Sequence, residues 1–285
     1  MSEKSKISYY SKNVINCPVC GKEFKKEDLL SGGGRMNAGN LTDELHRLYI
    51  PTKKYGPIYP LIYPVVVCPT CLYSAYISDF ETISPDSIFE LKNKTELRKE
   101  EAKNLFPRYN FSKNRTIIEG ILSYILAAIC YDSIDSSHQP IYKQGLSCLR
   151  AAWLCNDYHL VEPNENFDYL RDVMYRKADF FYSQMVEAEK DGIEEYGTIT
   201  HFGPDIDHNH GFDGALFLAG LLVYKHGQKD DKVKRLKSLH TAKITISRIV
   251  GMGKASKSKP SDFVESAREL HSKIKDEINR LEENS

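Results

Sequence analysis

The sequence predicts a mainly α-helical protein that begins with a small module of short strands. Residues 14–83 are rich in proline, glycine, tyrosine and valine, with short apolar runs bounded by turn residues, as in strands and turns. Beyond residue 86 apolar residues recur at intervals of three and four, the spacing of helices that bury one face. With 285 residues the chain can bury a core without disulfide bonds. We therefore expect a strand-rich module over 14–83 and a helical domain over 86–285.

The strand-rich module alternates turn signals with short apolar segments. Residues 63–67 (YPVVV) form an apolar run that leads into Cys68 and predicts a strand. Residues 31–34 (SGGG) predict a loop. The segment Leu41–Tyr49 (LTDELHRLY) predicts a short helix with Thr42 as its N-terminal cap.

Four helical segments are expected in the first half of the helical domain. Residues 90–106 predict an exposed, charged helix that ends before Pro107, because proline disfavours helical geometry in the preceding residue. Residues 116–131 and 141–155 carry apolar residues at helical spacing and are expected to pack as a hairpin. A longer amphipathic helix is expected over 165–192.

The remaining helices lie between residue 213 and the end of the chain. A short apolar helix is expected over 213–226, ending at Gly227 in the left-handed conformation. A further helix should cover 230–250, and the lysine, serine and glycine of 251–260 predict a linker. The terminal helix is marked by an apolar stripe at steps of three and four. This stripe consists of Phe263, Ala267, Leu270, Ile274, Ile278 and Leu281.

Four of the seven cysteines form two copies of a CPxC motif, Cys17 with Cys20 and Cys68 with Cys71. In such a tight turn two thiolates point at one centre, and backbone N–H groups can donate hydrogen bonds to sulfur. The alternative use of CxxC is thiol redox chemistry, but neither pair stands between a strand and a helix as in thioredoxin-like proteins. Four thiolates match tetrahedral zinc, so we predict one structural zinc ion in a zinc-ribbon-like module.

Longer segments around these motifs carry a family resemblance. They are CPVCGKEF at residues 17–24, YGPIYPLIY at 55–63, VVVCPTC at 65–71 and AYISDF at 75–80. Together they resemble a bacterial family catalogued as domain of unknown function 2225. The resemblance covers roughly residues 14–83 and implies a zinc-binding module followed by helices similar to tetratricopeptide repeats, with no established activity. The chain departs from the family pattern at Leu72, where glycine is usual, and in the glycine-rich segment 31–34.

The similarity to tetratricopeptide repeats depends mainly on two glycines. Gly220 follows Leu218 and Ala219, and Gly227 comes seven residues later. In these repeats the first glycine allows close helix contact and the second forms the turn. The small residue expected early in the next helix is replaced by Lys232, and no 34-residue self-similarity extends along the chain. A generic helical bundle is the alternative to a repeat-like domain.

One loop of the helical domain concentrates acids and imidazoles. Its candidate ligands are His201, Asp205, Asp207, His208 and His210. An EF-hand would need glycine where His210 stands and glutamate where Leu216 stands, so that pattern is incomplete. A transition-metal or catalytic site is one hypothesis for the loop. The other is a metal-free surface loop in which Asp213 caps the helix that follows, and this is the one we expect.

Charge is balanced overall but uneven along the chain. The 39 basic and 39 acidic residues cancel, which argues against a charge-driven commitment of the whole protein to nucleic acid or membrane. Residues 157–213 contain 14 acidic and 4 basic residues, whereas 225–259 contain 11 basic and 2 acidic residues. We expect these segments to neutralise each other, and the alternative is that the basic segment contacts an acidic partner or RNA.

The other sequence signals are mostly negative. Cys130, Cys148 and Cys155 lie in apolar helical segments and are expected to be buried core thiols. No Walker loop, GxSxG elbow, HExxH or dinucleotide-binding motif occurs. Neither a signal peptide nor a membrane span is indicated, which predicts a cytoplasmic protein without a membrane partner.

These observations lead to three functional hypotheses. The first is a cytoplasmic interaction scaffold, in which a zinc module fixes the start of a helical domain whose concave surface binds a protein or peptide. The second is a metal-dependent enzyme that uses the loop 201–213. The third is RNA binding through the basic segment 225–259, for which a steep salt dependence would be diagnostic.

Overall fold

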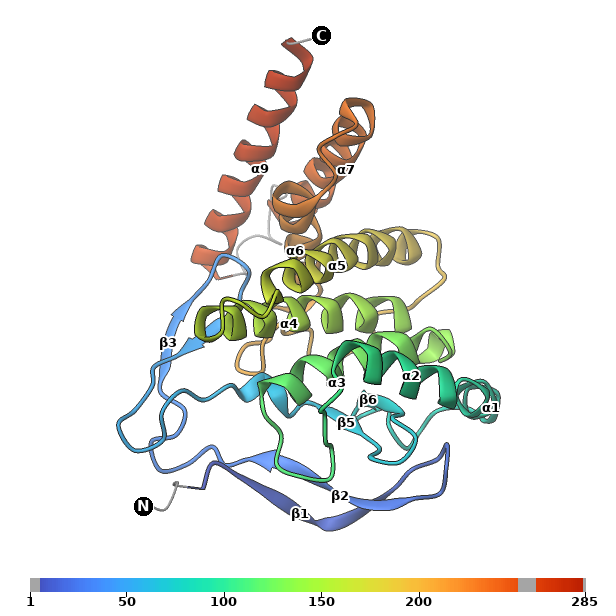
Figure 1. The fold of residues 1–285 in the computed structure, drawn as a ribbon. Coiled ribbons are helices and arrows are strands. Elements are labelled where there is room, and N and C mark those ends of the chain that lie inside the picture. Colours follow the sequence, from blue (N-terminus) through green and yellow to red (C-terminus); the bar gives the residue numbers. More distant parts are fainter. Residues whose placement is uncertain (1–5, 251–259, 284–285) are drawn as a thin grey trace.

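The computed structural model describes residues 6–250 and 260–283, and it places the strands within residues 8–29 and 65–76 at one end of a stack of helices and those within 38–49 along its side (Figure 1). The predicted mainly α fold with a strand-rich start is therefore confirmed. The helices are α1 (Pro85–Asn93), α2 (Thr95–Leu105), α3 (Ile117–Tyr131), α4 (Pro140–Val161), α5 (Phe167–Lys190), α6 (Gly211–His226), α7 (Lys232–Val250) and α9 (Ser261–Glu283). None of them is long and apolar enough to cross a membrane.

The strands form three separate antiparallel pairs. These are β1 (Ser8–Asn16) with β2 (Glu23–Leu29), β3 (Ala38–Leu41) with β4 (Arg47–Tyr49), and β5 (Val65–Val67) with β6 (Ser74–Tyr76). All three valines of β5 are buried, in agreement with the strand predicted from the apolar run. A two-stranded pair is marginal alone, so each pair needs further contacts to hold its shape.

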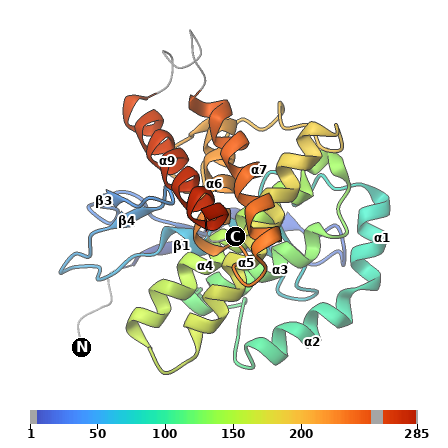
Figure 2. The same ribbon diagram turned by 90° about the horizontal axis from the view of Figure 1, so that it is seen from above.

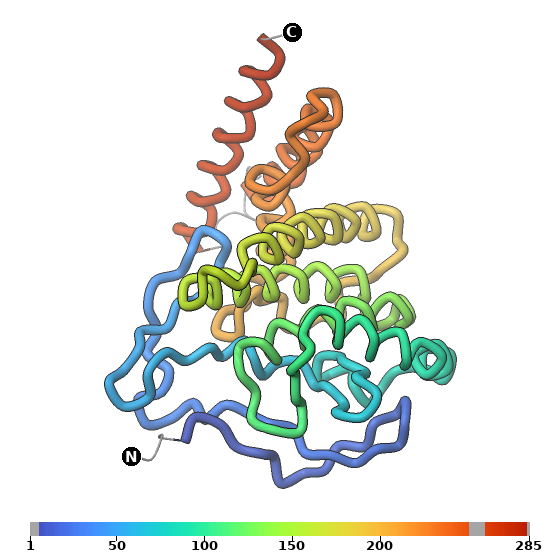
Figure 3. Tube along the Cα trace, viewed as in Figure 1, coloured from blue at the N-terminus to red at the C-terminus, as the bar shows by residue number. Residues whose placement is uncertain are grey.

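From α3 onward each helix packs against the next helix among the described residues, and α9 also contacts α6. Figure 2 shows α6, α7 and α9 side by side from above. In the tube view the start of α7 and the end of α9 stand away from the stack of α3 to α6 (Figure 3). Stacking of chain neighbours is common to repeat proteins and simple bundles, so the tetratricopeptide-like character stays a prediction.

Helix α3 joins the strand-rich part to the helices. Thr116 caps it as part of a capping box with Glu119. The short 3-10 helix Pro60–Ile62 lies directly on it, because the Tyr124 hydroxyl donates to the Leu61 carbonyl at 2.7 Å. A Cβ atom at Gly120 would come within 2.5 Å of the Ile62 side chain, so this contact requires glycine. The buried apolar core continues from the strands into the helices without a break.

The helix predicted over Leu41–Tyr49 is wrong, since this segment forms the end of β3, a turn and β4. The turn closes with a hydrogen bond from the Thr42 N–H to the His46 carbonyl and with Leu45 at φ 60°. Asp205 accepts a hydrogen bond from the Arg47 N–H at 2.8 Å, from 158 residues further along the chain. This distant contact overrides the local helical preference.

The single exposed helix predicted over 90–106 is also wrong. Two helices, α1 and α2, meet at Lys94, and α2 ends before Pro107 as expected. Arg98 is only 1% exposed, and its guanidinium donates to the carbonyls of Leu91 (2.6 Å) and Cys71 (3.3 Å). Arg98 thus binds the Leu91 carbonyl in the last turn of α1, a group that has no intrahelical partner where the helix ends.

The two glycines of the proposed repeat differ in their roles. Gly220 allows close contact as predicted, because a Cβ atom there would lie 2.6 Å from the Ile246 side chain on α7. Gly227 is not left-handed, since its φ is −60°. It is nevertheless confined, because a Cβ atom would meet the Val223 carbonyl oxygen at 2.5 Å and Arg235 Nη1 at 2.8 Å.

The other predicted helices are confirmed with adjusted ends. Helix α4 continues to Val161, and α6 begins at Gly211 with His210 at its cap, so Asp213 lies in the first turn and is not the cap. The apolar stripe of α9 is buried from Phe263 to Ile278. Of the predicted linker, residues 251–259 lie outside the described residues. The division into units over 14–83 and 86–285 stays a prediction.

Candidate metal centre

The first cysteine turn follows β1 directly. The Gly21 N–H donates to the Cys17 carbonyl at 2.8 Å, and the Cys17 N–H donates to the Lys22 carbonyl at 3.0 Å. Gly21 has a φ of 72°, a left-handed geometry that glycine adopts without strain. Contact with Cys68 and burial raise the pKa of the Cys17 thiol to about 12, while the Cys71 thiol and a hydrogen bond from the Cys20 N–H to the Cys17 sulfur oppose this rise.

The second cysteine turn repeats this geometry after β5. The Leu72 N–H donates to the Cys68 carbonyl at 3.0 Å, and the Cys68 N–H donates to the Tyr73 carbonyl at 2.9 Å. Leu72 takes the position of Gly21, with a φ of 58°, so the departure from the family pattern leaves the turn unchanged. The leucine side chain is buried, 2% exposed, and its packing offsets the cost of left-handed geometry, about 1–2 kcal/mol.

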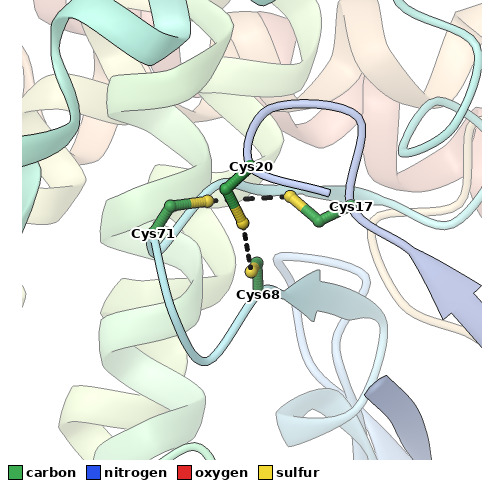
Figure 4. Close-up of side chains that lie close together, drawn as sticks. All are labelled: Cys17, Cys20, Cys68 and Cys71. Carbon is green, nitrogen blue, oxygen red and sulfur yellow. Dashed lines mark hydrogen bonds between the residues drawn. The ribbon is translucent and has the colours of Figure 1, made fainter. Parts of the chain in front are cut away.

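The two turns face each other and bring four sulfur atoms together (Figure 4). All four lie within 4.8 Å of one another, with 3.6 Å between Cys17 and Cys71 and 3.6 Å between Cys20 and Cys68. Four sulfurs at ~2.3 Å from a central zinc would be about 3.8 Å apart, so the separations suit a tetrahedral ion. Cys20 is exposed and the others are buried, so the centre has one side open to solvent.

Without a cation the four sulfurs compete for protons. Hydrogen bonding from Cys17 lowers the pKa of Cys68, while contacts with Cys17 and Cys68 raise the pKa of Cys71 far above its usual range. Such an unequal set is what results when like charges would crowd one small volume. A bound dication would remove this competition and stabilise all four thiolates together.

The second turn is fixed to the helices by two hydrogen bonds. The Cys71 carbonyl accepts from the buried Arg98 guanidinium on α2, and the Ser74 N–H donates to the Cys130 sulfur on α3 at 3.4 Å. Sequence reasoning identified the four cysteines but missed Arg98, because a lysine- and glutamate-rich segment gave no sign that one arginine is buried. Cys130, Cys148 and Cys155 are buried as predicted.

The acid-and-imidazole loop does not bring its predicted residues to one centre. Asp205 is buried, 1% exposed, and binds His46 Nδ1 at 2.6 Å, so the expectation that the loop lies on the surface is wrong for this residue. Asp207 binds Arg47 Nε at 2.7 Å. His201 Nδ1 accepts from the Gly203 N–H, whereas the His210 ring lies 5.7 Å from that of Phe263. His208 is exposed beside Asp207.

The loop therefore fastens the β3–β4 hairpin, and its use in a metal-dependent enzyme stays an untested hypothesis.

Part of the basic segment 225–259 forms ion pairs within the molecule. Lys225 binds Glu44, Arg235 binds Glu277, and Arg248 binds Glu189. The last of these joins the basic and acidic segments, as expected for neutralising faces, and RNA binding stays untested.

Comparisons with known proteins agree with the sequence resemblance. A family model described as "Uncharacterized protein conserved in bacteria (DUF2225)" matches residues 9–274 and so includes most of the helices. An uncharacterized protein of Borreliella burgdorferi is 44% identical over 276 residues, which make up 97% of this chain and 99% of the relative. No solved structure matches the chain.

Proposed function

Because the chain belongs to this family of uncharacterized bacterial proteins, DUF2225, we propose a function from its own site: a zinc-stapled helical scaffold that binds a protein or peptide. The observation that carries the proposal is the set of four cysteine sulfurs, which joins two distant segments and has no further ligand from the part of the chain that the structure describes. We also propose a cytoplasmic location, since reduced CxxC pairs fit a reducing compartment.

Zinc is the ion that the donor set favours. Four thiolates in tetrahedral arrangement are typical of structural zinc sites, whereas catalytic sites keep an open position for water. The ion would be held by Cys17, Cys20, Cys68 and Cys71, and it would supply charge compensation and a cross-link between the two turns. Backbone N–H groups around the sulfurs support the same reading, because they favour thiolates.

Metal analysis of protein purified without chelators tests the zinc proposal. We expect one zinc per chain, and we expect Cys68→Ser to release it and loosen the strand-rich part. Cys148→Ser is the matched control, since Cys148 is a buried thiol outside the quartet and should leave the zinc content unchanged. Fresh wild-type protein without zinc, or Cys68→Ser with full zinc, would refute the proposal.

The scaffold proposal is supported by a groove of about 640 Å³ between the β3–β4 hairpin, α6 and α9. Its apolar lining includes Leu41, Leu45, Phe217, Leu221, Phe263 and Leu270. The charged residues at its rim are Asp43, Asp262, Glu269, Lys225 and Lys273, three acids against two bases. Apolar grooves with polar rims are common sites for short peptide segments. The occupant that we propose is a partner's peptide with apolar side chains next to a basic residue.

Affinity capture with surface variants tests this groove. Leu41 is 37% exposed at the groove, and Ile77 is 52% exposed outside it. A true partner should be retained by the wild-type protein and by Ile77→Glu but lost from Leu41→Glu. If Leu41→Glu captures the same proteins as the wild type, the groove is not the binding surface. The zinc proposal is tested separately by the metal analysis.

A further inference from the structure

A second cavity, of about 360 Å³, lies on the other side of the β3–β4 turn, where the turn meets α4, α5 and α6. Its lining includes Glu44 and His46 from the turn, Trp153 and Asp157 from α4, Tyr175 from α5 and His226 from α6. These side chains come from four elements, yet they form one connected arrangement of rings and carboxylates. Such convergence of polar groups in a cavity is typical of small-molecule sites.

The deepest acid of the cavity, Glu44, already has all the donors that it needs. Its carboxylate accepts from Trp153 Nε1 at 2.6 Å and from the Tyr175 hydroxyl at 2.8 Å. Lys225 Nζ binds the other oxygen at 2.5 Å. Burial opposes its ionisation, but His226 and Lys225 outweigh burial and lower the pKa of Glu44 to about 2. Glu44 therefore holds the Trp153 and Tyr175 side chains in place, and it is not the group that we expect to bind a ligand.

Two stacked ring pairs form rigid walls of the cavity. His46 stacks on Trp153 with 4.3 Å between ring centroids, and His226 stacks on Tyr175 with 3.9 Å. The His46 ring is also held from behind by the buried Asp205 carboxylate. The walls are thus preorganised, which reduces the entropy cost of binding a ligand.

The Asp157 carboxyl is only partly buried and differs in its partners from the other carboxylates of the cavity. Among the described residues none donates a hydrogen bond to it, and its surroundings act on it only by burial and by longer-range charge. Burial raises the pKa of Asp157 to about 6, His46 opposes this rise and Asp205 adds to it. The nearby Tyr59 hydroxyl is neutral at physiological pH, and burial and the Asp157 charge raise its pKa further.

His226 Nε2 is buried and faces the Glu44 carboxylate at 3.9 Å, where it helps to keep that acid ionised. The basic side chains of the lining are also occupied. Lys225 binds Glu44 and Asp43, and Arg171 binds Asp172 and Asn156. The Asp157 carboxylate is therefore the acceptor that the cavity leaves to a ligand, which favours a ligand that carries positive charge and N–H groups.

We propose that this cavity binds a small organic cation of the amine or guanidinium class, with N–H groups that donate to the Asp157 carboxylate and a carbon chain that lies against the stacked rings. The ligand supplies the hydrogen bonds that Asp157 lacks in the protein. Its positive charge compensates the partly buried Asp157 carboxylate, whose ionisation burial opposes. Small-molecule binding here is separate from peptide binding in the groove and does not depend on it.

Calorimetric titration of the full-length protein with agmatine, which carries an amine and a guanidinium group, tests the proposal. Choline is the comparison cation because it has no N–H groups, and inorganic phosphate is the comparison anion. The matched variants are Asp157→Asn and Asp179→Asn. Asp179 is a good control because burial raises its pKa to about 6 as well, yet it does not line the cavity.

We expect agmatine to bind the wild type and Asp179→Asn equally, and Asp157→Asn at least about tenfold more weakly. Choline should also bind at least about tenfold more weakly than agmatine to the wild type. Both variants should retain the helical circular dichroism of the wild type, since asparagine has nearly the same shape as aspartate. Absence of agmatine binding up to about 10 mM, equal binding by Asp157→Asn, or preferential binding of phosphate would overturn the proposal.

Discussion

Gly220 on α6 packs against Ile246 on α7, and exchanging volume between these two residues tests how the helices are held together. In Gly220→Val three carbon atoms are added at a point where even a Cβ atom would lie 2.6 Å from Cγ1 and Cδ1 of Ile246. In Ile246→Ala three carbon atoms are removed from the facing side chain, which is fully buried. The double variant therefore keeps the total number of side-chain carbons.

The expected free energies follow from these contacts. Carbon atoms pack best at about 3.5–4.0 Å, so Gly220→Val forces a shift of about 1 Å and costs about 1–3 kcal/mol, less a few tenths for better helix propensity. Ile246→Ala leaves a cavity and costs about 2–5 kcal/mol. The double variant exchanges volume within one site and should cost less than about 1.5 kcal/mol. The coupling energy should thus be at least about 1.5 kcal/mol.

Urea unfolding followed by circular dichroism measures these energies, with metal content determined in parallel. Gly197→Ala is a suitable control, because its Cβ atom would have nothing within 4 Å. The zinc content should be the same in all variants, since the cysteine quartet lies elsewhere in the chain. If the two single costs simply add in the double variant, then Gly220 and Ile246 do not touch in solution and the α6–α7 packing described above is wrong.

Three further predictions concern other parts of the molecule. Gly21→Ala should lower the free energy of unfolding by about 1–2 kcal/mol, because φ is 72° there; an unchanged urea midpoint would contradict the turn geometry. Asp205→Ala should cost about 3–5 kcal/mol and speed hydrogen exchange at the Arg47 amide; protection equal to the wild type would show that Asp205 does not hold the hairpin. Asp179→Asn should raise stability at neutral pH by about 1–3 kcal/mol, because burial raises the pKa of Asp179 from 3.8 to about 6. The unfolded chain ionises first, so wild-type stability should fall as pH rises from about 4 to about 6, and thermal melts of the variant should show a smaller fall.

The parts of the fold that could be predicted are those that local sequence determines. Thr116 was expected at the start of its helix, and the Thr116–Glu119 capping box is a purely local interaction. The stripe of α9 could be recognised because six apolar residues follow helical spacing without interruption. The cysteine quartet could be recognised because sulfur ligands are rare and come in pairs at fixed spacing.

The parts that could not be predicted depend on contacts between distant residues. The segment LTDELHRLY contains good helix formers. In the folded protein, however, His46 and Arg47 form hydrogen bonds with Asp205. The free energy of these contacts exceeds the difference in helix propensity, which is at most about 1 kcal/mol per residue. Arg98 gave no sign of burial, because its acceptors are carbonyls, which every residue has. The cavity for which we propose a cationic ligand could not be predicted from the sequence either. Its lining residues are scattered from Glu44 to His226, and each is ordinary in its own segment.

The contact between the hairpin and the loop at Asp205 has a consequence for synthesis on the ribosome. Asp205, the partner of His46, is synthesised 159 residues after His46. This interval lasts roughly 10–30 s at bacterial translation rates. The cysteine turns, in contrast, are complete when Cys71 has emerged, 54 residues after Cys17. Nascent chains that stop before residue 205 should therefore resist proteolysis around the cysteine turns while residues 38–49 are still cleaved. Early metal capture would then shield the segments around the two cysteine turns from aggregation but not the hairpin that lies between them in the sequence, and the hairpin would be the last strand pair to form.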